Sequence, residues 1–245
     1  MRYAIISDIH SNLTAFRAVL QDVHAGGGAD HIWCLGDIVG YGPDPNECIN
    51  LLRQYDHTCI VGNHDWGALG RADLSYFNDD AAAACRWTGR VLGTDETDYL
   101  GSLPLTRCEG DFTLAHGSPR DPIWEYLLSP YEADVSFHLF QTRYCLVGHT
   151  HVPLLFESPG DCLESVLYRL SPDTPLELGQ NRLIINPGSV GQPRDADPQA
   201  SYALFDTESS SVHLYRVPYD IAATQRKMDE QGLPPRLAAR LGYGW

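Results

Sequence analysis

The sequence predicts an α/β fold with a parallel sheet at its core. Three features point to it: short apolar runs typical of buried strands, segments with helical spacing between them, and a polar group directly after each run. Repeated strand–helix–strand units form parallel sheets with right-handed crossovers. Because open α/β sheets bind ligands at the carboxyl ends of their strands, the polar groups mark a candidate site.

The first quarter of the chain supplies three predicted strands and two predicted helices. Residues 2–7 form the first strand, and apolar side chains at helical spacing predict a helix over 13–24. A second strand is expected at 31–35. A loop rich in glycine and proline follows it, and then a helix over 46–55. The third strand, at 57–61, is rich in β-branched residues and completes the expected parallel core.

The middle of the chain continues with alternating patterns. Residues 66–102 are expected to be helical, since two aspartates and four alanines at 79–84 make a strong helix start. Short strands are predicted near 104–108 and 111–115. A helix over 130–140 and a strand at 143–147 follow.

The last third reads differently, as a series of hairpins followed by a helical tail. Apolar runs separated by turns predict strands at 153–156, 166–170, 182–185, 201–205 and 212–217. The tail over 219–245 carries two helical patterns, broken by glycine and proline at 232–235. We find no repeat and no clear linker, so a single domain over 1–245 is the expected organisation.

Composition limits the partners that this chain can take. The sequence has 17 basic and 32 acidic residues, a formal net charge of −15, and no basic block. This balance argues against binding long nucleic acid through phosphate neutralisation. It leaves a small phosphate ester open as a substrate, because bound divalent cations reverse the local field of an acidic protein.

Hydropathy and cysteine usage indicate a cytoplasmic protein that does not enter a membrane. No apolar run approaches the ~20 residues that span a bilayer. The seven cysteines (positions 34, 48, 59, 85, 108, 145 and 162) are widely spaced and contain no Cys-x-x-Cys pair. We expect reduced thiols, and no zinc site made of cysteines. The sequence does not specify an oligomeric state.

The candidate site is a set of polar side chains at predicted strand ends, with the tetrad Gly62-Asn63-His64-Asp65 at its centre. Any one of them alone is better explained as a turn or capping residue, and Asp65 is expected to cap the helix that follows. Together they offer carboxylate, amide and imidazole groups, which suit zinc, manganese, iron or nickel better than calcium or magnesium. The set is Asp8, His10, Asp37, Asn63, His64, His116, His149 and His151.

These residues form five ordered blocks: Asp8-x-His10, Gly36-Asp37, Gly62-Asn63-His64-Asp65, His116 and Gly148-His149-x-His151. The series resembles the signature of the calcineurin-like metallophosphoesterases. The tail over 186–245 is similar to that of the small bacterial and archaeal, phosphodiesterase-like members. The resemblance implies a four-layer α-β-β-α sandwich of two packed mixed sheets flanked by helices.

The resemblance also implies a dinuclear centre of two divalent transition-metal ions, manganese, iron, zinc or nickel. Position by position, Asp8, His10 and His151 would hold the first ion. Asn63, His116 and His149 would hold the second, and Asp37 would bridge both. The chemistry implied is hydrolysis of a phosphate ester by in-line attack of a metal-bridging hydroxide.

His64 lies beside Asn63 and is not a ligand in the resembled family. We therefore expect it to act as the general acid that protonates the leaving oxygen. The alternative role for His64 is a hydrogen-bond donor that only binds phosphate.

The substrate prediction rests on a departure from better-known branches of the family. Protein phosphatases and symmetrical diadenosine tetraphosphate hydrolases carry an arginine after the Gly-Asp block, where this chain has Gly40 and Tyr41. Without that bidentate partner for a doubly charged monoester, we favour a small phosphodiester. The alternatives are a phosphomonoesterase, a dinucleoside polyphosphate hydrolase, and a non-catalytic metal-binding scaffold.

Four residues are candidate substrate contacts, each with a simpler alternative role. Arg120 and Arg194 could replace the missing arginine, although surface ion pairs are the commoner role for such residues. Asn12 could reach a phosphate oxygen or cap the first helix. Tyr41 could stack on a base or cover its loop.

Overall fold

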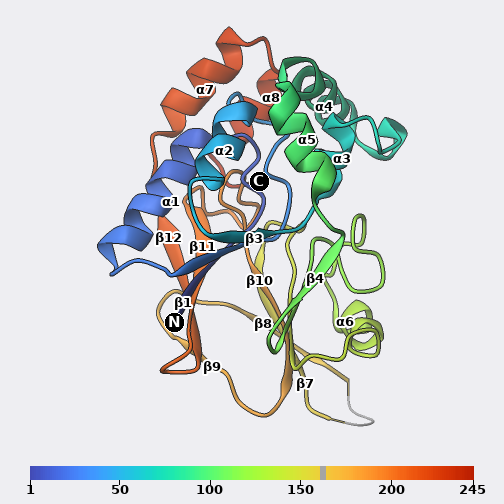
Figure 1. The fold of residues 1–245 in the computed structure, drawn as a ribbon, viewed down its shortest axis with the longest axis vertical. Helices are drawn as coiled ribbons and strands as arrows, with labels where there is room; N and C mark the ends of the chain where they lie inside the picture. The colour runs from blue at the N-terminus through green and yellow to red at the C-terminus, as the bar shows by residue number, and fades with distance from the viewer. Residues whose placement is uncertain (161–163) are drawn as a thin grey trace.

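The computed structural model describes residues 1–160 and 164–245 of the chain, and two six-stranded sheets form its centre (Figure 1). The first sheet has the order β3-β2-β1-β11-β12-β9. Its strands are β1 (Arg2–Ile6), β2 (His31–Cys34), β3 (His57–Cys59), β9 (Leu176–Glu177), β11 (Ala200–Asp206) and β12 (Ser211–Val217). β1, β2 and β3 are parallel, whereas β11, β12 and β9 pair antiparallel, so the sheet is mixed.

The second sheet has the order β4-β5-β6-β10-β7-β8 and is also mixed. Its strands are β4 (Thr106–Glu109), β5 (Phe112–Ala115), β6 (Tyr144–Leu146), β7 (Pro153–Ser158), β8 (Val166–Arg169) and β10 (Arg182–Pro187). Here β5, β6 and β10 are parallel to one another, and the outer strands are antiparallel. The two parallel sets bring the carboxyl ends of five strands, β1 to β3, β5 and β6, toward one region.

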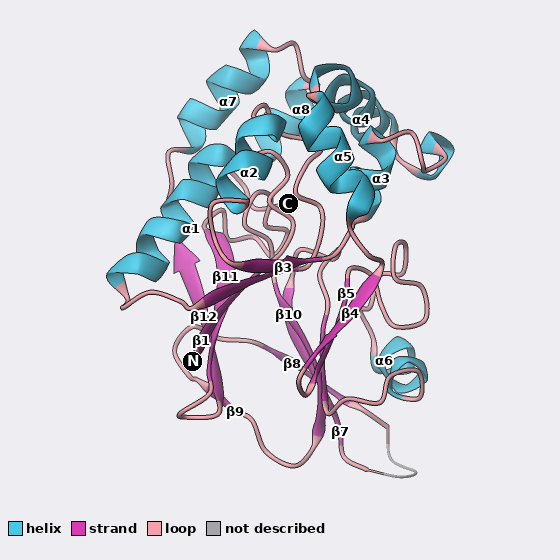
Figure 2. Ribbon diagram, viewed as in Figure 1, coloured by secondary structure: helices cyan, strands magenta, loops and turns pink. Residues whose placement is uncertain are grey.

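Helices cover the outer sides of the two sheets (Figure 2). The described helices are α1 (Leu13–Ala25), α2 (Pro45–Leu52), α3 (Asn63–Ala68), the short 3₁₀ helix η1 (Leu74–Tyr76), α4 (Asp79–Val91), α5 (Thr94–Ser102), α6 (Pro130–Phe137), α7 (Ile221–Glu230) and α8 (Pro235–Arg240). Most of them lie over the first sheet, and α6 lies against the second. The four-layer sandwich of two mixed sheets flanked by helices is confirmed.

The alternation of side chains along the strands explains why four layers form. In β1, Ile6 packs with Phe16 of α1, whereas its neighbour Ile5 points the other way and packs with Leu114 of the second sheet. On the far side of the second sheet, Phe137 of α6 packs against that sheet. The central strands of each sheet are therefore buried on both faces, which accounts for their lack of alternating polarity, whereas β4 and β8 at the edges of the second sheet are largely exposed.

The secondary structure predicted for the middle region was wrong in some details. The single helical stretch expected over 66–102 is divided into α3, η1, α4 and α5. Gly70 takes a positive φ of 67° just after α3, which ends that helix. The two-residue strand β9 was not expected from the sequence, because two residues are too few to show a period.

The C-terminal tail forms the two predicted helices, α7 and α8. Met228 of α7 and Leu237 of α8 pack with Ala84 of α4 and with the ring of Tyr41. This packing brings the end of the chain close to the loop that follows β2.

Two further expectations concern cysteines and membranes. The six cysteines within the described residues are free thiols, and the seventh, Cys162, lies outside the described residues. In the part of the chain that the structure describes, no helix has both the length and the apolarity needed to cross a bilayer.

Candidate metal centre

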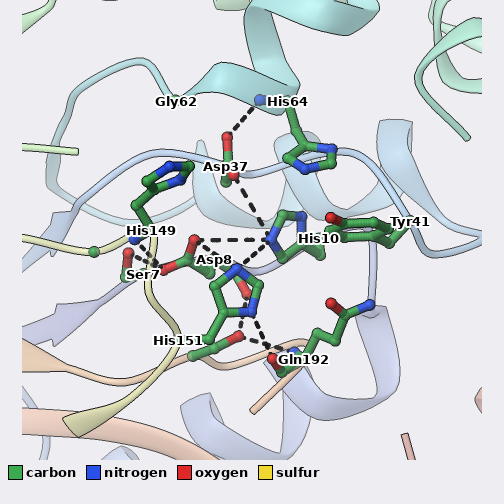
Figure 3. A network of polar contacts seen from close by, with 12 residues as sticks. Ser7, Asp8, His10, Asp37, Tyr41, Gly62, His64, His149, His151 and Gln192 are labelled. Atoms are coloured by element: carbon green, nitrogen blue, oxygen red, sulfur yellow. Dashed lines mark hydrogen bonds and ion pairs between the residues drawn. The ribbon is translucent and has the colours of Figure 1, made fainter. Parts of the chain in front are cut away.

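The candidate ligands come together in one buried cluster, as Figure 3 shows for most of them. Asp8 and His10 follow β1, and Asp37 follows β2. Asn63 opens α3 just beyond β3, His116 follows β5, and His149 and His151 follow β6. The exposed fractions of these seven side chains are between 0% and 4%, so bulk water is excluded from the ligand atoms.

The backbone at these strand ends is strained. Positive φ angles, rare for residues with a side chain, occur at Asp8 (55°), His10 (50°), Asp37 (52°), His149 (65°) and His151 (60°). Strain of this kind costs on the order of 1–3 kcal/mol per residue and persists only where the surroundings enforce it. The sharp turns aim the side chains inward instead of continuing the strands.

One group of possible ligand atoms is formed by Asp8, His10 and His151. The Nε2 atom of His151 lies 3.2 Å from Asp8 Oδ1 and 3.1 Å from His10 Nε2. These distances leave room for a single cation bound by all three side chains.

A second group is formed by Asp37, His116 and His149, with Asn63 beside it. The Nε2 atom of His116 lies 3.3 Å from Asp37 Oδ2 and 3.1 Å from Asn63 Oδ1. The same Asp37 Oδ2 is 3.7 Å from His10 Nε2 in the first group. Asp37 thus lies between the two groups.

Each of the four histidines is held by a backbone carbonyl through its other ring nitrogen. The contacts are His10 Nδ1 to Val39 O (3.1 Å), His116 Nδ1 to Leu35 O (2.8 Å), His149 Nε2 to Trp124 O (3.2 Å) and His151 Nδ1 to Gln192 O (2.6 Å). This is the usual support for a metal-binding histidine, because it fixes the tautomer and turns the free nitrogen toward the ion. The inward nitrogens are therefore Nε2 of His10, His116 and His151, and Nδ1 of His149.

Each of the two aspartates has one carboxylate oxygen that accepts hydrogen bonds and one that does not. Asp37 Oδ1 accepts from the backbone N–H of His64 at 2.8 Å, and Asp8 Oδ2 accepts from Ser7 Oγ at 2.5 Å. Asp8 Oδ1 and Asp37 Oδ2 are buried and have no hydrogen-bond partner among the described residues. Unpaired buried carboxylate oxygens are costly, so this donor set fits a pair of cations.

The pKa shifts of the buried groups also agree with ionised aspartates among mostly neutral histidines. Burial favours the protonated form of Asp8 and Asp37, but His151 and His116 respectively hold the pKa of each carboxyl below its usual range. Burial lowers the pKa of His10 well below its usual value. Burial also opposes a charge on His116, yet the Asp37 carboxylate overrides it and raises the pKa of His116 to about 10. With no cation bound, a proton on His116 would thus partly offset the buried acids, and a metal ion would take its place.

Asp65 supports the loop that carries Asp37 and not the side chain of the histidine next to it. Its carboxylate accepts from the backbone N–H groups of Gly62 (2.9 Å), Asp37 (2.9 Å) and Val39 (3.1 Å). The bond to Gly62 caps α3, the role expected for Asp65. The other two fix the loop that carries Asp37.

His64 lies at the edge of the cluster, with its ring centroid 4.9 Å from that of His10 and 4.2 Å from that of Tyr41 (Figure 3). Its Nδ1 atom is 3.4 Å from Cys85 Sγ, a neighbour that the sequence did not suggest. Burial lowers the pKa of His64 to about 4. The ring is therefore neutral around pH 7.

Arg194 reaches the cluster from the loop after β10. Its Nη2 atom lies 3.3 Å from the hydroxyl of Tyr41 and 3.1 Å from Gln192 Oε1, and its guanidinium lies 5.8 Å from the centroid of the Tyr41 ring. Its Nε–H is buried and has no partner among the described residues. A cation is thus held beside the Tyr41 ring and its hydroxyl.

The other two candidate substrate contacts have their side chains bound elsewhere. Asn12 accepts from the Ala15 N–H at 3.2 Å, which caps α1, and donates to Gly191 O at 2.9 Å. Arg120 forms an ion pair with Glu125. Both arrangements match the alternative roles, helix cap and ion pair, and we do not include either residue among the substrate contacts proposed below.

Tyr126 is another residue at the site that the sequence did not suggest. Its ring stacks on that of His149, with centroids 4.1 Å apart and planes 21° apart, and 48% of the residue is exposed. Trp124, two residues earlier, packs against Phe77 with ring centroids 5.2 Å apart. The loop after His116 therefore forms an aromatic rim over one side of the cluster.

Comparison with known proteins agrees with the fold. A model of the calcineurin-like phosphoesterase superfamily domain matches residues 1–210. The crystal structure of a metallophosphoesterase from Sphaerobacter thermophilus superposes with a TM-score of 0.91 at 45% identity, covering 100% of this chain and 99% of that one. A protein from Methanocaldococcus jannaschii, MJ0912, is 42% identical over 98% of this chain and 97% of its own length. A symmetrical bis(5'-nucleosyl)-tetraphosphatase from Aromatoleum aromaticum is 26% identical over 45% of this chain and 42% of its own length.

Proposed function

The chain belongs to the calcineurin-like phosphoesterase superfamily and is a phosphoesterase, and from this premise we propose a dinuclear metal-dependent hydrolase of small phosphodiesters. The observation that carries the proposal is the pair of buried, unpartnered carboxylate oxygens, Asp8 Oδ1 and Asp37 Oδ2, among four oriented histidines. Each oxygen faces the Nε2 atom of a histidine, His151 at 3.2 Å for Asp8 and His116 at 3.3 Å for Asp37, which suits a cation bound by both groups.

The proposed ligands are those of the two groups described above. Asp8, His10 and His151 would hold one ion, Asn63, His116 and His149 the other, and Asp37 both. The oxygen and nitrogen donors suit manganese, iron, zinc or nickel. When bound, such a pair of cations supplies an activated water and neutralises charge on the phosphoryl oxygens.

The ring of His64 is proposed to donate a hydrogen bond to the oxygen of the leaving alcohol. Its backbone N–H is tied to the bridging carboxylate of Asp37 at 2.8 Å, which sets the ring at a fixed place beside the cluster. A donor held in this way stabilises charge on the leaving oxygen without reorganising.

Arg194 is proposed to bind a phosphoryl oxygen, assisted by Tyr41. One fixed arginine matches the single negative charge of a phosphodiester. The exposed ring of Tyr126 borders the same side of the site and would contact the alcohol part of a small ester.

Hydrolysis of dinucleoside polyphosphates is the second candidate. It is supported by the tetraphosphatase relative, which matches less than half of this chain. The exposed aromatic rings at the rim would suit a nucleobase equally well.

A panel assay tests the proposal. The full chain, reconstituted with Mn²⁺, Ni²⁺, Zn²⁺ or Fe²⁺, is assayed with bis(p-nitrophenyl) phosphate, p-nitrophenyl phosphate and diadenosine tetraphosphate. The proposal predicts that the diester is hydrolysed with a higher kcat/KM than the monoester. Faster cleavage of the tetraphosphate would favour the second candidate, and two bound ions with no turnover of any ester would favour a scaffold.

A further inference from the structure

The thiol of Cys85 lies against the ring of His64. Cys85 belongs to α4, is completely buried, and places its Sγ atom 3.4 Å from His64 Nδ1. A hydrogen bond of this length is within the range for sulfur. The contact joins α3, which begins at the proposed ligand Asn63, to α4, which carries no proposed ligand.

Two glycines make the contact possible. A Cβ atom on Gly67, one turn along α3 from His64, would lie 2.9 Å from Cys85 Sγ. A Cβ atom on Gly40 would lie 2.7 Å from His64 Nδ1. Nδ1 is therefore enclosed by Gly40 on one side and by the thiol on the other, and any larger residue at either glycine would push the ring or the thiol away.

The direction of the hydrogen bond depends on which nitrogen of the His64 ring carries the proton. Burial, and then the charge of Asp37, raise the pKa of the Cys85 thiol well above its usual range, so the sulfur keeps its proton. A neutral imidazole has one donor nitrogen and one acceptor nitrogen. If the thiol donates to Nδ1, then Nδ1 is the acceptor and the ring proton is on Nε2.

The carboxylate nearest in sequence does not compete for this role. Asp65 already accepts three backbone hydrogen bonds, from Gly62, Asp37 and Val39. Among the described residues, Cys85 is the hydrogen-bond partner of the His64 ring.

We propose that Cys85 is a positioning residue that keeps His64 in the Nε2–H tautomer, so that Nε2 offers its proton to the reacting ester. The inference rests on the proposed role of His64 as donor. A neutral ring acts here as a hydrogen-bond donor to the oxygen that gains charge, as the neutral histidine of triosephosphate isomerase does. Without the thiol, the proton would be shared between the two nitrogens and part of the population would present an acceptor.

The test compares Cys85→Ala, which removes the donor, with Cys85→Ser, which restores a donor. Cys48→Ala is the matched control, because Cys48 is an equally buried cysteine in α2, away from His64. The ¹⁵N shifts of His64, in the full chain with and without Zn²⁺, report which nitrogen carries the proton. Metal content and steady-state kinetics are measured on the same samples.

We expect the wild type, Cys85→Ser and Cys48→Ala to carry the proton on Nε2, and Cys85→Ala to show a mixture. We also expect Cys85→Ala to lower kcat about tenfold at unchanged KM and metal content, and serine to restore most of it. A proton on Nδ1 in the wild type, or an unchanged tautomer in Cys85→Ala, would overturn the inference. If Cys85→Ala does not fold, the ¹⁵N shifts of His64 in the wild type and in Cys85→Ser still show whether the proton is on Nε2.

Failure of the wider proposal would look different. If replacing His64 itself left kcat unchanged, the role of His64 as donor would be lost, whereas the ¹⁵N shifts would still show whether Cys85 sets the tautomer.

Discussion

The proposed metal-binding side and the proposed substrate-facing side of this site are built in different ways. The proposed ligands project from strand ends, are almost completely buried, and are held by backbone groups. The proposed substrate contacts, Arg194, Tyr41 and Tyr126, come from loops and are held by one another or by a neighbouring ring. The two sets therefore depend on different supporting contacts. Substitutions on the two sides should separate metal binding from turnover.

The largest effect is expected at the residue between the two groups. Asp37→Asn replaces the shared carboxylate by a weaker neutral ligand, so both ions should bind less tightly and activity should fall by at least about 10³-fold. Metal content by mass spectrometry and kcat on the same preparation check this. A variant that keeps two ions and full activity would show that Asp37 is not a bridge.

His64→Asn should show the opposite combination. It removes the proposed donor and leaves every proposed ligand in place, so kcat should fall about 10²- to 10⁴-fold while two ions remain bound. Metal loss in parallel with activity would place His64 on the metal-binding side.

Removing the metals should make stability depend on pH in a defined direction. Burial lowers the pKa of His64 to about 4 and that of His149 to about 3, against about 6.5 in the unfolded chain. At these two positions the unfolded state binds more protons, so their contribution to stability is full above pH 6.5 and is lost as pH falls through this window. Asp65, whose pKa is raised to about 7, and His116, whose pKa is raised to about 10, contribute in the opposite direction. The slope is on the order of 1.4 kcal/mol per pH unit for each histidine. Urea unfolding in EDTA from pH 7 to pH 4.5, compared between the wild type and His64→Asn, measures the contribution of His64, and equal slopes in the two proteins would contradict the assignment.

The smallest effect is expected on the substrate-facing side. Arg194→Ala should lower kcat/KM for a diester about tenfold, since one charged hydrogen bond is lost, and leave metal content unchanged. Arg107→Ala is the matched control, because Arg107 is a mostly exposed arginine on β4. Equal effects of the two substitutions would remove Arg194 from the substrate contacts.

The sequence predicted the fold class and the set of candidate ligands, because both depend on local patterns. A polar residue directly after a buried run, as at Asp37 or His149, is visible in the chain itself. The ordered blocks also carried the family resemblance. The cap formed by Asp65 was expected for the same local reason.

Contacts between distant elements were not predictable in this way. Cys85 reaches His64 only because α3 and α4 pack closely at Gly67, and no motif marks a thiol in an alanine-rich helix. Arg194 was one of two candidate arginines, and only the folded loop shows that it, and not Arg120, lies beside Tyr41. These contacts depend on how separate elements pack together, and the sequence pattern within one element does not predict that packing.

Anomalous diffraction from crystals soaked in Mn²⁺ would locate the bound ions. A dinuclear centre should give two peaks about 3.5–4 Å apart, with Asp37 between them, one beside His10 and the other beside His116. A single peak, or an ion bound outside both groups, would contradict a dinuclear centre at the ends of these strands.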